Sequence, residues 1–267
     1  MSFQPVIPTG GLTGWNYLNR TLQKQTQAFD KSPQISRDTE YFEKNISKAR
    51  TADDLVSDRR LLRVALGAFG LSDDLNSTAF VRTILAGGTD DKTALANKLS
   101  DVRYREFSKA FGFGDAAGPQ TSSLSWARDI VSKFQRREFE VAVGEQDRSM
   151  RLAMDAKRSL PDIAGQAAKE ETRWLKILGN PPLREVFETA LGLPSSFGQA
   201  DLDMQIGEFS DRAKRQLGID SLAQLSDPAL QEVVIERFLM RDQIKSFDIQ
   251  SSGTIALTLL QSMPRLF

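Results

Sequence analysis

Apolar residues recur along this chain at the three- and four-residue spacing of α-helices. Glycine and proline separate the periodic segments from one another. No stretch shows the sustained apolar and polar alternation of a β-strand, so the sequence predicts no sheet. The predicted helices cover 37–49, 59–69, 78–86, 91–99, 102–111, 169–178, 182–191, 202–217, 221–225 and a last segment that starts at 228 and reaches 247.

Capping residues predict where several helices begin and end. Ser36 and Asp58 are predicted N-caps, because their side-chain oxygens can accept bonds from free backbone N–H groups. The segment 125–160 lacks proline and has Gly144 as its single glycine, which predicts one long helix or two helices broken near Gly144. Pro161 is predicted to end this segment, since proline cannot donate the next backbone bond.

Two parts of the chain resemble each other. Asp58–Leu71 reads DRRLLRVALGAFGL and Asn180–Leu193 reads NPPLREVFETALGL, and both end in Gly-Leu. A Leu-Ser-Asp string follows each of them, at 99–101 and 225–227. Capped amphipathic helices resemble one another for physical reasons, which is the alternative explanation. The shared order of elements favours two related modules, at about 58–113 and 180–239.

We therefore expect an all-α protein with two related multi-helix modules joined by a long central helical segment. The predicted organisation is a flexible N-terminal tail and first helix at 1–35, a first helical module at 36–119, a central helical segment at 120–179, a second module at 180–247 and a C-terminal apolar tail at 248–267. Residues expected in the two cores are Leu61, Val64, Ala65, Phe69, Phe107 and Phe111 in the first, and Leu183, Val186, Phe187 and Leu191 in the second.

The composition narrows the possible chemistry. The chain has no Cys and no His, which excludes disulfides, thiol nucleophiles and imidazole bases or ligands. Lys and Arg number 35, as do Asp and Glu, so the net charge is zero and no general attraction to nucleic acid is expected. We expect no cofactor, no bound metal and no nucleic-acid partner.

Acidic pairs are the remaining candidates for catalysis. They occur at 53–54, 73–74, 90–91 and 170–171, mostly near predicted helix starts, where the helix dipole favours negative charge. Adjacent helical residues point in different directions, so these pairs are not expected to converge on a substrate. The loop at 87–93 begins Gly-Gly but lacks the spacing of a phosphate-binding loop, and we interpret it as a turn.

Neither a signal peptide nor a membrane span is expected. The first 14 residues lack a basic region and an apolar core, and their prolines and glycines predict an unstructured tail. No apolar run reaches the roughly 18 residues that a membrane helix needs. We expect a protein that is cytoplasmic or that leaves the cell by a route needing no cleaved signal.

Three strings in the first half carry a resemblance to a known family. They read ADDLVSDRRLLRVALGAFGL at 52–71, AFVRTILAGGTDD at 79–91 and LANKLSDVRYREFSKAFGFG at 95–114, and NPPLREVFETALGLP continues the likeness in the second half. They resemble the DUF1217 family of alphaproteobacterial proteins, whose members are often encoded among flagellar genes. The resemblance implies a flagellum-associated, non-catalytic helical protein. Every matched residue has a core, cap or turn role, so no catalytic residues carry over.

Three functions follow from these observations. The first is a structural or assembly protein of the flagellar system, with other proteins, chiefly flagellar components, as partners. The sequence predicts no particular oligomeric state. The second is a cytoplasmic adaptor or export chaperone of the same system, and the third, disfavoured, is a carboxylate-based hydrolase acting on cell wall.

The central segment and the terminal tail are the expected partner surface. Long arginine stems with charged ends suit helix–helix interfaces, and apolar tail residues suit a partner's groove. The alternative is that these residues pack on the chain's own core. The candidate partner-binding residues are Arg136, Arg137, Arg148, Arg151, Leu259, Leu260, Met263 and Phe267.

Overall fold

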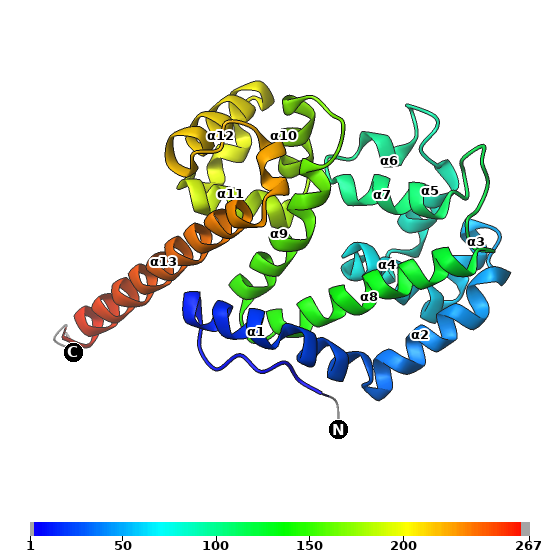
Figure 1. Ribbon diagram of the computed structural model, residues 1–267, viewed down its shortest axis with the longest axis horizontal. Helices are drawn as coiled ribbons and strands as arrows, with labels where there is room; N and C mark the ends of the chain where they lie inside the picture. The colour runs from blue at the N-terminus through cyan, green and yellow to red at the C-terminus, as the bar shows by residue number, and fades with distance from the viewer. Residues whose placement is uncertain (1–2, 263–267) are drawn as a thin grey trace, which may run out of the picture. The chain divides into compact units, whose positions relative to one another are not determined.

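The computed structural model describes residues 3–262, with side chains for all of them except Ser195 and 247–262. Within that range the chain is helical throughout and contains no strand, which confirms the all-α prediction (Figure 1). The α-helices are α1 (Gly11–Asp30), α2 (Pro33–Asn45), α3 (Ala52–Ser57), α4 (Arg59–Phe69), α5 (Thr78–Gly87), α6 (Leu95–Lys98), α7 (Val102–Phe111), α8 (Leu124–Gly144), α9 (Arg148–Ala164), α10 (Glu170–Leu178), α11 (Pro181–Leu191), α12 (Leu202–Leu217) and α13 (Pro228–Ser262). Short 3₁₀ turns connect several of them.

The chain forms two compact units. Among the described residues, unit 1 comprises 3–8, 17–151 and 178–181, and unit 2 comprises 9–16, 152–177 and 182–262. The first predicted module lies within unit 1. The predicted central segment is not a separate body, because α8 belongs to unit 1 and most of α9 belongs to unit 2.

Helix α4 is the centre of unit 1. It contacts α2, α3, α7 and α8, and nearly all of its residues from Leu61 onward are buried. Gly67 allows the close crossing with α8, because a Cβ there would lie 2.7 Å from the ring of Phe134. Phe69, Phe107 and Phe111 pack in the same core with edge-on or tilted rings, whose centroids lie 5.1 to 6.4 Å apart. The predicted core of the first module is therefore confirmed.

Unit 2 is built on a second aromatic cluster. The ring of Trp174 packs edge-on against Phe187 at 5.6 Å and against Phe209 at 5.9 Å. Leu183, Val186, Phe187 and Leu191 are fully buried, as the sequence predicted.

The two modules repeat the same local geometry. Gly70 and Gly192 both take the left-handed conformation, with φ of 70° and 66°. In each case the following leucine donates its N–H to the carbonyl five residues back, Leu71 to Leu66 and Leu193 to Glu188. This is the Schellman motif, which satisfies free carbonyls at a helix end.

The order of elements after these motifs also agrees. A 3₁₀ turn, a helix, a short Leu-Ala element and an Asp-capped helix follow in both modules: Ser72–Asn76, α5, α6 and α7 in the first, and Ser195–Gln199, α12, Leu222–Ser226 and α13 in the second. Asp101 and Asp227 cap the last helix in the same way, each accepting from the backbone N–H two residues on, at 3.0 and 2.9 Å. The expected order of elements is confirmed.

Several predicted helix boundaries are wrong. The helix expected at 37–49 begins at Pro33, because the fixed φ of proline suits the first helical position, and Ser36 lies inside the helix. The helix expected at 91–99 is only α6, since the Asp91 carboxylate accepts from the Thr93 N–H at 2.8 Å and forms a turn there.

Pro161 does not end α9, which continues to Ala164. Leu160, Ile163 and Ala164 are buried, and this apolar burial offsets the backbone bond that proline cannot donate. The break near Gly144 is confirmed, because α8 ends there.

Both chain ends contain more helix than the sequence predicted. Helix α1 starts at Gly11, inside the segment expected to be unstructured. Helix α13 passes the predicted end at residue 247 and runs for 35 residues to Ser262.

Candidate functional site

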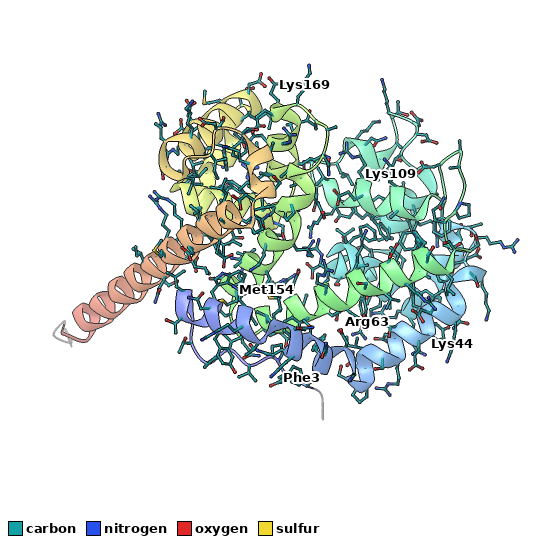
Figure 2. The ribbon with its side chains drawn as sticks, viewed as in Figure 1. Phe3, Lys44, Arg63, Lys109, Met154 and Lys169 are labelled. Carbon is teal, nitrogen blue, oxygen red and sulfur yellow. The ribbon has the colours of Figure 1, made fainter. Side chains whose placement is uncertain are left out.

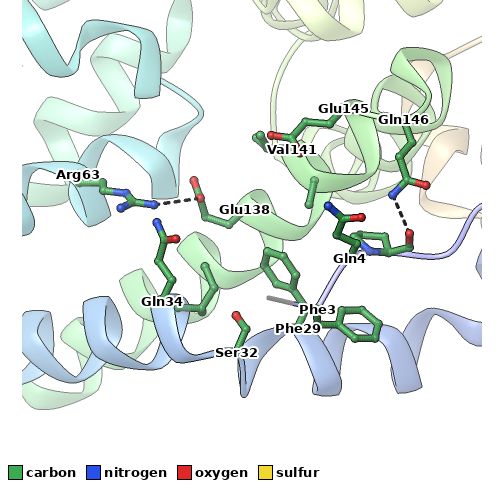
Figure 3. Close-up of a pocket in the computed structure, with 13 residues that line it drawn as sticks. Phe3, Gln4, Phe29, Ser32, Gln34, Arg63, Glu138, Val141, Glu145 and Gln146 are labelled. Carbon is green, nitrogen blue, oxygen red and sulfur yellow. Dashed lines mark hydrogen bonds and ion pairs between the residues drawn. The ribbon is translucent and has the colours of Figure 1, made fainter. Parts of the chain in front are cut away.

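A cavity of about 440 Å³ opens in unit 1 (Figure 3). Its walls come from the N-terminal segment at 3–5, the α1–α2 junction, α4 and the C-terminal half of α8. Apolar side chains such as Phe29, Ile35 and Val141 share the lining with charged and amide groups.

An ion pair holds Arg63 at one wall of this cavity. The Arg63 Nη1 lies 3.1 Å from an oxygen of Asp38, whose side chain is only 11% exposed. With the Gln34 side-chain amide oriented to place its oxygen toward Arg63, that oxygen accepts from both Nη atoms, at 2.6 and 2.9 Å. Figure 2 shows Arg63 among the side chains that fill the space near α2 and α8. Asp38 on α2 thus offsets part of the charge of Arg63, since the Arg60 Nη2 also lies 3.8 Å from this carboxylate.

Glu138 faces the same wall from α8 with weaker support. Its carboxylate lies 4.0 Å from the Arg63 Nη2, beyond hydrogen-bond distance. Burial is the main cause that raises the pKa of Glu138, and the negative charges of Asp38 and Glu145 raise it further. Arg63 and Arg151 act in the opposite direction without cancelling the effect.

The N-terminal segment is fixed over this cavity by side-chain amides. The Gln25 side chain accepts from the Val6 N–H at 2.7 Å and donates to the Val6 carbonyl at 3.1 Å. Gln146 donates to the Pro5 carbonyl at 2.6 Å, as the dashed line in Figure 3 shows. The expectation of an unstructured tail is wrong here, because two glutamines satisfy a backbone that has no helix or sheet to pair with.

The acidic pairs have structural roles rather than a shared site. Asp54 closes a capping box with Thr51, and Asp74 accepts a 2.6 Å bond from the hydroxyl of Tyr104. Among the described residues, no group of three or more acidic side chains is placed to hold a metal ion. In the Gly-Gly loop, the N–H groups of Thr89 and Asp90 donate to the carboxylate of Asp115, so they serve the fold.

Helix α13 carries an exposed apolar face in unit 2. Val233, Met240 and Ile244 are 41%, 45% and 60% exposed. Their spacing of seven and four residues places them on one side of a helix. The opposite side is anchored by the buried Phe238, while Arg237 lies beside the exposed apolar side chains and donates to the Ala190 carbonyl at 3.0 Å. Figure 1 shows α13 continuing well past the other helices of unit 2.

The four candidate arginines of α8 and α9 differ in environment. Arg137 is largely covered, lies 3.9 Å from Glu140 and approaches Gly70. Arg136, Arg148 and Arg151 are exposed, and the stem of Arg151 lies against Gly144. Because Arg137 is largely covered within unit 1, it packs against the unit's own residues. Contact with a partner stays a prediction for all four arginines.

The four candidate residues of the tail fall outside the described side chains. Leu259 and Leu260 belong to α13, and only their backbone is described. Met263 and Phe267 lie outside the described residues.

Sequence analysis did not find the cavity. Gln34, Arg63, Glu138 and Glu145 come from three separate stretches of the chain and share no spacing signal. Sequence analysis also missed the apolar face of α13, although a signal was present: its residues have seven- and four-residue spacing within the part of the helix that was predicted.

Among the described residues, no helix combines the length and the apolar run that crossing a membrane requires.

These features define an all-α protein of two helical units with repeated caps, and comparisons with known proteins agree with this class. The profile of the DUF1217 family, described as a protein of unknown function, matches residues 68–231, and the chain belongs to this family. The crystal structure of protein AGR_C_984 from Agrobacterium tumefaciens is similar in fold, with a TM-score of 0.73 and 28% sequence identity over 91% of this chain and 99% of that one. Among proteins with curated descriptions, none matches this chain in sequence.

Proposed function

We propose that this chain is a non-catalytic structural or assembly protein of the bacterial flagellar system that acts through helix-mediated protein contacts. Membership of the DUF1217 family supports the flagellar part, since the resemblance to that family implies a flagellum-associated protein. The absence of Cys and His from the sequence supports the non-catalytic part, because the commonest nucleophile and base are missing.

The exposed face of α13 carries the proposal of helix-mediated contact. Helix α13 is anchored to unit 2 on one side, where Glu232 accepts a 2.7 Å bond from the indole N–H of Trp15. Val233, Met240 and Ile244 face outward on a helix of 35 residues. An apolar helix face of this kind is the part that docks in helix-in-groove recognition. Each of these side chains would gain up to about 1–2 kcal/mol by leaving water in a partner's groove.

A charge-introducing double variant tests this proposal. Met240→Glu with Ile244→Glu places two carboxylates on the exposed face, where both side chains already contact water. The protein is expected to keep its helix content and its melting temperature, while co-purification with flagellar components and cell motility are lost.

Met204→Glu is the matched control, because Met204 is 61% exposed on α12 and lies outside the proposed surface. This variant is expected to behave as the wild type in all assays. Normal motility and normal co-purification in the α13 double variant would overturn the proposal.

A further inference from the structure

We propose that the cavity of unit 1 binds an alkyl cation, an alkylammonium or alkylguanidinium group, with its charge beside Glu138 and Glu145. This inference is independent of the proposed flagellar function. It starts from the charges that line the cavity, which are Arg63, Glu138 and Glu145.

The lining as a whole is negative, because Glu138 and Glu145 face the single cation of Arg63. Asp38, whose carboxylate lies 3.1 Å from the Arg63 Nη1, offsets part of that cation's charge. With its amide oxygen turned toward Arg63, Gln34 accepts from both Nη atoms and holds the guanidinium at the wall. Arg151, the other cation near Glu138, is not part of the lining.

Glu138 lacks a hydrogen-bond donor in the part of the chain that the structure describes. Its contact with Arg63 is 4.0 Å, and its side chain is only 18% exposed. Burial of this carboxylate without a donor carries a desolvation cost that Arg63 and Arg151 offset only in part. A ligand that donates N–H bonds to it would remove that cost, and charge-assisted bonds of this kind are among the strongest in proteins.

The remaining walls suit the hydrocarbon part of such a ligand. Phe3, Phe29, Ile35 and Val141 line the same cavity (Figure 3). A volume of about 440 Å³ falls in the range of small-molecule sites, which combine apolar walls with a few polar groups. The glutamine contacts of Pro5 and Val6 hold the N-terminal wall in place, so the site is formed before the ligand arrives.

Calorimetric titration of the full chain at neutral pH tests this inference. The probes are butylammonium and butylguanidinium, with butanol as the uncharged control of similar shape. Saturable binding of a cation is expected, at least tenfold tighter than that of butanol. A Gly-Lys-Gly peptide with blocked ends separates the sources: binding as tight as butylammonium points to a protein side chain, and weaker binding points to a free amine.

Charge-removing variants locate the site. Glu138→Gln and Glu145→Gln keep side-chain size and should each weaken cation binding at least tenfold, while Glu43→Gln, on an exposed position of α2, should leave it unchanged. Cation binding should also weaken as the pH falls and Glu138 takes up a proton. The charged neighbours that influence the pH of this protonation are Asp38, Glu145, Arg63 and Arg151. Absence of saturable binding, equal binding of butanol, or full affinity in a Glu138→Gln variant that is folded and unfolds cooperatively would overturn the inference.

Discussion

Truncation of Phe187 to Ala tests the packing of unit 2. The Phe187 side chain is completely buried, and its ring packs edge-on against Trp174 at 5.6 Å. Removing a buried phenylalanine costs about 3–5 kcal/mol, because apolar contacts are lost and a cavity remains. The aromatic pair accounts for about 0.5–1.5 kcal/mol of such an effect. We therefore expect a loss of about 4 kcal/mol in the free energy of unfolding.

Urea unfolding followed by circular dichroism and by tryptophan fluorescence measures this loss. Phe197→Ala is the control in the same unit, because Phe197 is half-buried and its ring tilts against Phe209 at 6.2 Å. The control should lose only about 1 kcal/mol, since less apolar area leaves water in the native state. Equal losses for the two variants, or a loss below about 1 kcal/mol for Phe187→Ala, would refute the assignment of Phe187 to the core.

Three further changes have expected outcomes. Gly70→Ala should lower the free energy of unfolding by about 1–2 kcal/mol, because Gly70 has a φ of +70°. Gly207→Ala should raise it by about 0.5–1 kcal/mol, because Gly207 lies on the exposed face of α12 with open space around it. Urea unfolding should show changes of opposite sign for the two variants. The pKa of Glu138 is raised, so the folded state holds this proton more tightly than the unfolded state, and the free energy of unfolding falls as the pH rises through the raised pKa. Glu138→Gln should therefore be more stable than the wild type at neutral pH. This gain should vanish as the pH falls toward 4.5, the ordinary pKa of a glutamate. Burial and the bond to Asp74 raise the pKa of Tyr104 to about 12, so ultraviolet titration should show one tyrosine ionising near there, and Asp74→Asn should lower that value.

Local signals in the sequence predict much of the fold. Gly70 and Gly192 both follow an apolar helix, and both take the left-handed conformation that only glycine adopts cheaply. The buried positions of α4 and α11 follow from helical periodicity alone. The helix boundaries near Pro33 and Pro161 were predicted wrongly. A proline constrains one position, whereas the burial of neighbouring side chains decides how far the helix extends.

The candidate sites were less predictable. The cavity depends on Arg63 and Glu138 meeting across α4 and α8, and a long-range meeting of this kind leaves no spacing in the sequence. The fixed N-terminal segment depends on Gln25 and Gln146, and a glutamine has no distinctive pattern when it binds a distant backbone. The apolar face of α13 follows from periodicity, but only the structure shows that the opposite face is the buried one.

Cell fractionation tests the central claim most directly. The wild-type chain and the Met240→Glu/Ile244→Glu variant would be quantified by immunoblotting in purified basal bodies, in the export medium and in the cytosol. The proposed function predicts that the wild-type chain co-purifies with flagellar structures and that the variant, folded normally, is lost from them. Recovery of the wild-type chain from the cytosol alone, with no flagellar protein bound to it, would contradict the proposed function.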